Sequence, residues 1–466
     1  MSKLNKDILY FILKELHNDK KALHSCLLVN KIWCEIVIPI LWGNPWKYLI
    51  YRKRKFLLDV IISHLSDESR NKLENDGSFN LYKKPLFNYI NYCRRLNLNI
   101  IRELVNDCGV WIVYNEIIQL FINENTPLSH LYIPQRFDYP IRLIPGVERC
   151  ISKIEFLSCD TNISDNILCG LIEMCKSIRE LELIINVVNN NYGIAKLIES
   201  SEKLIDVRFL TNYITKVHDV PFCNVLENSL IKHANTIQHF KINKKPTTQI
   251  LSHLINLKSL VLDDAYRGEK WDCLENLTLP YLQVLKVNIN FPTTSLANMI
   301  ENTSGYLTEI TIDGEGYDGF DNKKIIQAIY TKCPNLKYIK LEINNNNIFE
   351  LEKLLIKCQY LEGLFTTIQS NSCHFSWITF FEMLTESSPT NLFRFKFKYI
   401  SNDDHTALKL FFDNWESRCP SHPMILQFLM PHSISVKNKN LIKKYKAEGV
   451  IKKVANHLHG EDFEWI

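Results

Sequence analysis

One apolar pattern recurs along most of this sequence and constrains its fold more than any other feature. The pattern is the hexad Leu-x-x-Leu-x-Leu, in which Ile, Val, Phe or Met can replace Leu. Successive hexads begin 20 to 33 residues apart, mostly within or just above the interval of about 20–29 residues that is typical of leucine-rich repeats. They begin at Ile151, Ile178, Leu204, Ile237, Leu257, Leu282, Leu307, Leu336, Leu361, Leu392 and Ile425, and the one from Leu361 is broken by Thr366 at its last position.

Helix-like stretches lie between the hexads, so each repeat should hold one short strand and one helix. Ile325–Tyr330 and Leu351–Ile356 carry apolar residues at helical spacing. A unit of this size cannot bury its apolar face alone, and stacking on neighbouring units solves this problem. The sequence therefore predicts an α/β repeat fold, with a strand–helix leucine-rich-repeat solenoid over residues 147–432.

The 14 cysteines are scattered singly along the chain, without a Cys-x-x-Cys pair. Three of them, Cys175, Cys333 and Cys358, stand three residues before the first residue of a hexad, where other repeats have Ser or Ala. Small buried residues explain this position better than redox chemistry does. Unpaired cysteines and an N-terminus without a secretory signal favour an intracellular location, cytoplasmic or nuclear.

The first forty residues are expected to form three short helices. Asn5 can cap the first helix, Asn18 and Asp19 suit the turn before the second, and the third should end near Pro39. A unit of about 40 residues cannot bury enough apolar surface to be stable alone. Some of its apolar side chains should therefore face a partner or a neighbouring domain.

The segment from Leu4 to Trp33 resembles an F-box. It carries the spaced aliphatic residues of that family and a Val-x-x-x-Trp ending, although Asn5 stands where the family usually has Pro. The resemblance implies docking to a Skp-type adaptor. Periodicity cannot separate an interface from a core, so the alternative is that several of the implied contact residues form the core of the three helices. The implied contacts are Leu4, Ile8, Ile12, Leu16, Val29 and Trp33.

The same resemblance implies a function and a division of the chain. The cysteine-containing repeats look like those often fused to F-boxes, and together they imply the substrate-recognition subunit of a Skp–cullin–F-box (SCF) E3 ubiquitin ligase. The implied partners are the adaptor, a cullin–RING ligase and a protein substrate, with no cofactor, metal or catalytic residue. The alternative is a leucine-rich-repeat scaffold with no ligase role. The expected parts are an F-box (1–44), a helical linker or N-terminal cap (45–146), the solenoid (147–432) and a C-terminal helical cap or tail (433–466).

A candidate substrate site follows from the alternation of strand side chains. Residues between the apolar hexad positions should point out of the open face of the sheet, and this row changes from acidic near Glu180 to basic near Lys398. Aromatic residues and Arg are enriched at binding hot spots, although such charges can also simply keep the face soluble. The predicted substrate-binding residues are Tyr338, Lys340, Phe365, Arg394 and Lys396.

Other functional classes find little support in the sequence. With 55 Lys and Arg against 51 Asp and Glu, the net charge of +4 gives no reason to expect binding to nucleic acid or a membrane. The segment Gly314–Gly319 has the Gly-x-Gly-x-x-Gly spacing, but the helix after it should begin too late to bind a pyrophosphate. A calcium loop starting at Asp313 has Asp318 at its glycine position and Lys324 at its closing glutamate position.

Overall fold

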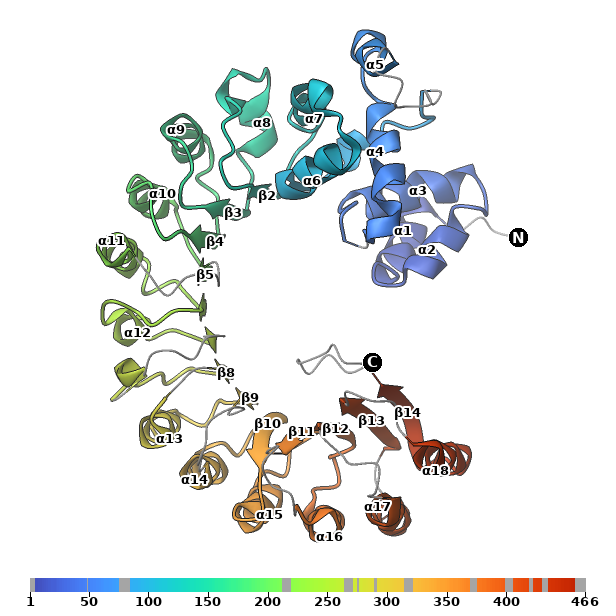
Figure 1. The fold of residues 1–466 in the computed structure, drawn as a ribbon, viewed down its shortest axis with the longest axis vertical. Helices are drawn as coiled ribbons and strands as arrows, with labels where there is room; N and C mark the ends of the chain where they lie inside the picture. The colour runs from blue at the N-terminus through green and yellow to red at the C-terminus, as the bar shows by residue number, and fades with distance from the viewer. Residues whose placement is uncertain are drawn as a thin grey trace. The chain divides into compact units, whose positions relative to one another are not determined.

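A computed structural model of the chain divides into two compact units, residues 1–233 and 234–466. In each unit, parallel strands alternate along the chain with helices (Figure 1). The prediction of a strand–helix leucine-rich-repeat solenoid is confirmed. The structure describes residues 5–47, 49–74, 84–211, 219–263, 271–274, 276–288, 291–313, 322–368, 375–398, 405–418, 422–429 and 435–456.

The first unit begins with three short helices, α1 (Lys6–Glu15), α2 (Lys20–Cys26) and α3 (Lys31–Trp42). Their caps are those that the sequence indicates: the Asn5 side chain accepts a hydrogen bond from Asp7 N, and the Asp19 side chain accepts one from Ala22 N. The prediction that the third helix ends near Pro39 is wrong. Proline removes only one donor, and α3 continues until Gly43 N donates to Pro39 O at 2.9 Å.

The rest of the first unit is a parallel sheet of order β1–β2–β3–β4–β5 with helices between its strands. The strands are β1 (Arg95–Asn97), β2 (His130–Ile133), β3 (Phe156–Asp160), β4 (Glu180–Ile185) and β5 (Asp206–Thr211). The helices are α4 (Arg54–Ile62), α5 (Asp67–Glu74), α6 (Leu98–Cys108), α7 (Tyr114–Phe121), α8 (Val147–Ile151), α9 (Asp165–Met174), α10 (Ile194–Ser200) and α11 (Val220–Ile231).

Strands β1 and β2 lie in residues 45–146, which were expected to be helical. Leu96 pairs with Leu131, so each strand carries a buried hexad position. The second hexad, Leu128-x-x-Leu131-x-Ile133, satisfies the sequence pattern in full. Repeats of the strand–helix type therefore begin before residue 147.

The second unit is a parallel sheet that runs in sequence order from β6 to β14, with helices α12–α18 along one of its faces (Figure 1). Its strands are β6 (His239–Ile242), β7 (Ser259–Asp263), β8 (Val284–Asn288), β9 (Glu309–Ile312), β10 (Tyr338–Ile343), β11 (Gly363–Ile368), β12 (Arg394–Lys398), β13 (Met424–Leu429) and β14 (Ile451–Asn456). Its helices are α12 (Ile250–His253), α13 (Thr293–Glu301), α14 (Lys323–Lys332), α15 (Ile348–Lys357), α16 (Trp377–Ser387), α17 (His405–Ser417) and α18 (Val436–Ala447). The C-terminal segment, expected to be helical, thus contains a strand as well as a helix.

Strand pairing corrects the predicted start of two hexads. Leu157 pairs with Leu181, so the hexad of β3 begins at Ile154 and not at Ile151. Leu426 pairs with Phe395, so the hexad of β13 begins at Pro423 and not at Ile425. In both places the predicted frame satisfies the pattern in full, whereas the observed frame contains a residue outside it, Cys159 in β3 and Pro423 before β13. Only the register of the sheet reveals the observed frame.

Within each unit, a single backbone carbonyl joins most repeats to the next. In the second unit, Lys258 N and Ser259 N both donate to Gln238 O, at 2.7 and 3.0 Å, and the same arrangement recurs from repeat to repeat. The three N-terminal helices are joined to the first strand in the same way, because Arg94 N and Arg95 N donate to Gly43 O at 3.1 and 3.2 Å. The end of α3 therefore takes the place of a preceding repeat.

The cysteines before the hexads are buried where successive repeats meet. The Cys175 thiol donates to Ile151 O at 3.6 Å, and the Cys358 thiol donates to Cys333 O at the same distance. Burial raises the pKa of Cys175, Cys333 and Cys358 to about 12. These thiols pack as small side chains, as the sequence predicted.

We expect these three thiols to react with a thiol-specific reagent only when the protein unfolds. The thiolate is the reactive form, and burial both suppresses it and blocks access. The measurement is mass-spectrometric mapping of labelled cysteines over time at neutral pH, with exposed Cys169 as the internal control. Labelling of the three at the rate of Cys169 in the folded protein would contradict the expectation.

A second expectation concerns Leu285, a fully buried hexad residue of β8. Leu285→Ala should lower the apparent free energy of unfolding by about 2–5 kcal/mol, because it leaves a cavity at a contact between repeats. Gln283→Ala, at an exposed position next to the same strand, should change it by less than about 0.5 kcal/mol. Urea unfolding followed by circular dichroism tests both, and equal effects would show that the hexad does not form the core.

Candidate protein-binding surfaces

The N-terminal helices expose an unusual number of large apolar side chains. On α1, Tyr10 is exposed, and so are Ile8, Phe11 and Ile12, whose spacing places these three on one helical face. Further ones precede or begin α3, namely Leu28, Val29 and Ile32. The core of these helices is built from other residues: Leu9, Leu13, Leu23 and Val37. We call six of the exposed residues, Ile8, Phe11, Ile12, Leu28, Val29 and Ile32, the N-terminal apolar set.

The structure separates the predicted adaptor contacts into two groups. Ile8, Ile12 and Val29 are 52%, 49% and 54% exposed. Leu16 and Trp33 pack against the small core and are only partly accessible. Leu4 lies outside the described residues. Ile8, Ile12 and Val29 are thus exposed, as an interface requires, whereas Leu16 and Trp33 pack against the core. Adaptor binding itself stays a prediction.

The acidic row on the sheet of the first unit surrounds one arginine. Arg208 pairs with Asp206 at 2.8 Å, and its guanidinium lies 3.6 Å from a Glu182 oxygen and 4.0 Å from a Glu180 oxygen. The hydrogen bond with Asp206 is the first cause of the raised pKa of Arg208. The cation offsets part of the negative charge of this face.

His130, on the same face, is held in its neutral form. Its ring stacks on Phe156 with centroids 5.3 Å apart, and Nδ1 lies 2.9 Å from the Ser129 hydroxyl oxygen. Burial first, and the charge of Arg95 second, lower the pKa of His130 to about 4.

The open sheet face of the second unit forms a groove of about 460 Å³ across β6 to β10. Its lysines face carboxylates. Lys286 lies 3.0 Å from Glu309, Lys340 lies 3.0 Å from Asp313, and Lys241 lies 4.0 Å from Asp263. The groove is therefore polar, with its charges largely paired inside it.

The five predicted substrate-binding residues do lie together, on β10, β11 and β12. Lys340, Phe365 and Lys396 occupy one row of the sheet. Tyr338 and Arg394 flank Gly363, which has no side chain, so the guanidinium reaches across it to donate to the Tyr338 hydroxyl at 2.9 Å. The Tyr338 hydroxyl in turn donates to Glu362 at 2.8 Å.

Three of these five residues are not accessible to solvent. Lys340, Phe365 and Lys396 are buried, and Lys396 has no exposed surface at all. The two ammonium groups lie 4.8 and 5.9 Å from the centre of the Phe365 ring, so the aromatic face and the cations shield one another. Tyr338 and Arg394 keep partial exposure.

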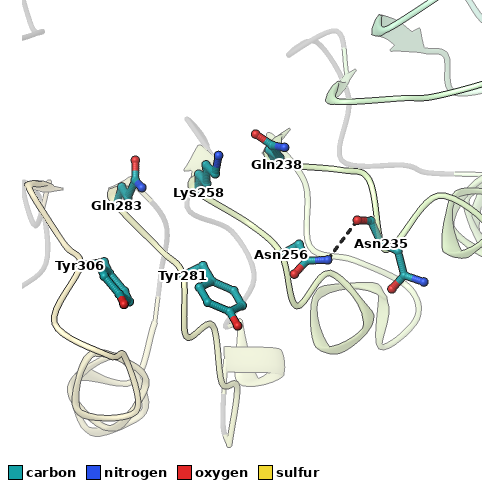
Figure 2. Close-up of a pocket in the computed structure, with 7 residues that line it drawn as sticks. All are labelled: Asn235, Gln238, Asn256, Lys258, Tyr281, Gln283 and Tyr306. Atoms are coloured by element: carbon teal, nitrogen blue, oxygen red, sulfur yellow. Dashed lines mark hydrogen bonds between the residues drawn. The ribbon is translucent and has the colours of Figure 1, made fainter.

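A second groove lies at the edge where the strands of the second unit begin, and the sequence had not indicated it as a site. It holds about 350 Å³ (Figure 2). Tyr281 and Tyr306 are 52% and 51% exposed, with ring centres 6.5 Å apart. Both stand directly before the first hexad residue, and this shared position was the available sequence signal. The lining residues of this edge groove are Asn235, Gln238, Asn256, Lys258, Tyr281, Gln283 and Tyr306.

The chain shows only weak similarity to known proteins. No model of a known protein family matches the sequence, and no curated protein matches it. The leucine-rich repeat-containing protein LegL7 from Legionella pneumophila is 12% identical, with 63% of this chain and 91% of that chain covered and a TM-score of 0.36. A leucine-rich-repeat protein from Leptospira interrogans is 13% identical over 72% and 86% of the two chains, with a TM-score of 0.34. Both scores are low, so the assignment of the repeats rests on the strand register and hexads of this chain.

The described residues contain neither a cluster of metal ligands nor a membrane-spanning helix. Their His, Cys, Asp and Glu side chains nowhere gather in threes as metal ligands do. Within the same residues, no helix combines the length and apolarity needed to cross a membrane. The glycine-rich segment from Gly314 to Gly319 lies outside the described part of the chain.

We expect His130 to make the first unit less stable as the pH falls. An unfolded histidine takes up a proton near pH 6.5, whereas folded His130 stays neutral to about pH 4. Between these values the unfolded state binds more protons, so stability is complete above about pH 6.5 and decreases towards pH 4.

The measurement is the urea midpoint at about pH 7.5 and about pH 5. His130→Asn should show a smaller loss between the two than the wild type, and His253→Asn, at an exposed histidine, should show the wild-type loss. An unchanged loss in His130→Asn would contradict the assignment.

Proposed function

We propose that this chain is the substrate-recognition subunit of an SCF E3 ubiquitin ligase. In this proposal, the N-terminal helices bind a Skp-type adaptor and the repeats bind a protein target. The observation that supports it most directly is the exposure of Ile8, Ile12 and Val29, three residues that the F-box resemblance assigns to the adaptor interface. The alternative is a repeat scaffold with no ligase role.

The N-terminal apolar set has the properties of a docking surface. The helices already have a core of their own, so these side chains are available to a partner without loss of packing. Burial of a large aliphatic side chain is worth about 1.5–3 kcal/mol. Several such residues within about forty positions favour a permanent or frequent partner over a solvated surface.

The proposed mechanism is positional. The adaptor and a cullin–RING ligase hold a ubiquitin-loaded conjugating enzyme, and the repeats hold the target at high effective concentration beside it. Within the first unit, the hydrogen bonds from Arg94 N and Arg95 N to Gly43 O fix the adaptor-binding helices to the first repeat. Trp46 supports this join, because its Nε1 donates to Arg95 O at 2.6 Å. On the target side, Tyr338 and Arg394 are the predicted contacts that remain accessible.

The decisive experiment is binding of the full chain to a purified Skp-type adaptor. Ile8→Asp combined with Ile12→Asp should weaken binding at least about tenfold, because each change removes an apolar contact and would bury a charge. The matched control is Phe349→Asp combined with Ile356→Asp, which makes the same kind of change at exposed apolar residues of α15. Trp33 is less suitable for mutation because it packs against the core.

Circular dichroism should show that both double variants keep the wild-type helix content. Undiminished binding by Ile8→Asp, Ile12→Asp would remove these residues from the interface. Failure of the wild-type chain to bind the adaptor would favour the scaffold without a ligase role.

A further inference from the structure

The edge groove presents side chains in a regular row. Gln238, Lys258 and Gln283 occupy the same position in three successive repeats and lie side by side, with Tyr281 and Tyr306 in a second row (Figure 2). The backbone carbonyls of this first row are occupied by the hydrogen bonds that join the repeats. Recognition at this edge therefore has to use side chains.

Thr308 and Lys337 continue the row on the next two repeats, since Lys337 N donates to Thr308 O and Thr308 N donates to Gln283 O, each at 2.8 Å. Parallel strands lie about 4.8 Å apart. Three such steps separate Lys258 from Lys337, a distance of about 14 Å. Four residues of an extended chain span nearly the same length, at about 3.3 Å each.

Among the residues that the structure describes, the positive charge between Lys258 and Lys337 is not compensated by ion pairs. Glu362, which follows Lys337 in the row, uses its carboxylate to accept a hydrogen bond from the Tyr338 hydroxyl. Within the described residues, neither Lys258 nor Lys337 has a carboxylate within ion-pair distance, whereas the lysines of the sheet-face groove do. Both ammonium groups belong to exposed residues. The side-chain amides of Gln238 and Gln283 likewise make no hydrogen bond to any described residue. The row thus offers two cations and two amides to a ligand.

The second row adds apolar contact area. Tyr281 and Tyr306 present two neighbouring rings, and tyrosine is enriched at the centres of protein interfaces because it offers a large rigid surface with a polar tip. At equivalent positions Asn256 and Asn335 instead use their amides to bond the preceding repeat, at Asn235 O and Gly305 O. Tyr281 and Tyr306 do not replace this amide contact with the preceding repeat, and their side chains remain available to a partner.

We propose that the edge groove binds an extended acidic segment of a partner protein, in which two carboxylates four residues apart pair with Lys258 and Lys337. The residues between the carboxylates pack on Tyr281 and Tyr306, and Gln283 hydrogen-bonds their backbone. If the proposed ligase function holds, this segment belongs to the target. The groove itself needs no adaptor.

The observations favour a protein segment over a nucleic acid. A nucleic acid carries a phosphate at every nucleotide, and its binding depends on many neutralised phosphates. The row offers two lysines separated by uncharged residues, and the chain has a net charge of only +4. This spacing matches two separated carboxylates.

The test is direct binding of a fluorescein-labelled peptide, Gly-Glu-Ser-Tyr-Ser-Glu-Gly, to the full chain, followed by fluorescence anisotropy without adaptor. Lys258→Glu combined with Lys337→Glu should weaken binding about tenfold or more, because it replaces attraction by repulsion at both ends. Lys324→Glu combined with Lys357→Glu makes the same change of net charge on exposed helix residues and should stay within about twofold of the wild type. Tyr281→Ala combined with Tyr306→Ala should also weaken binding.

Three controls complete the design. A peptide with Gln in place of both Glu residues, and one with the two Glu residues adjacent, should bind more weakly than the parent peptide. Equal loss in the two lysine double variants, equal binding of the Gln peptide, or no binding of the Glu peptide would overturn the proposal. Tighter binding of single-stranded DNA at the same lysines would overturn it in favour of a nucleic-acid site. Because the assay contains no adaptor, its result is independent of the adaptor-binding test.

Discussion

A paired hydrogen bond between repeats determines the rest of this structure. One carbonyl, such as Gln238 O, accepts the N–H groups of two consecutive residues of the next repeat. This contact fixes the register of each parallel strand against its neighbour. Because strand side chains alternate, a fixed register sends every hexad to the helix side and every intervening residue to the open face. A shift of one residue would reverse both faces.

The surfaces follow from this regularity, since equivalent residues of successive repeats form rows. On the open face, rows combine charges of opposite sign, as between Lys286 and Glu309. A glycine in a row leaves a gap that a longer neighbour can cross, as Arg394 does over Gly363. At the edge where the strands begin, the part of the row from Gln238 to Lys337 contains no acidic residue, and the positive charge of Lys258 stays available. Function in such a fold therefore depends on which residue occupies a repeated position.

Much of this architecture could be predicted from local sequence. The hexads located most strands, and Asn5 and Asp19 marked helix starts, because these signals depend on neighbouring residues. The frame of the hexads at β3 and β13 could not be predicted, because the observed frames contain Cys159 and Pro423 while a neighbouring frame satisfies the pattern in full. The burial of Lys396 could not be predicted from local sequence either. It depends on Phe365, which is 31 positions away in sequence but adjacent in the sheet.

The role of Gly43 has a consequence for how such a chain can change. Its carbonyl accepts two N–H groups at the start of the first strand, as the carbonyl of one repeat accepts two from the next. The N-terminal helices are therefore attached by the same backbone contact that joins the repeats. Duplication or deletion of a whole repeat changes the number of these backbone contacts and leaves each remaining contact intact. The length of the array, and with it the length of each row that faces a partner, can therefore diverge among descendants of this sequence while the N-terminal helices keep the same attachment.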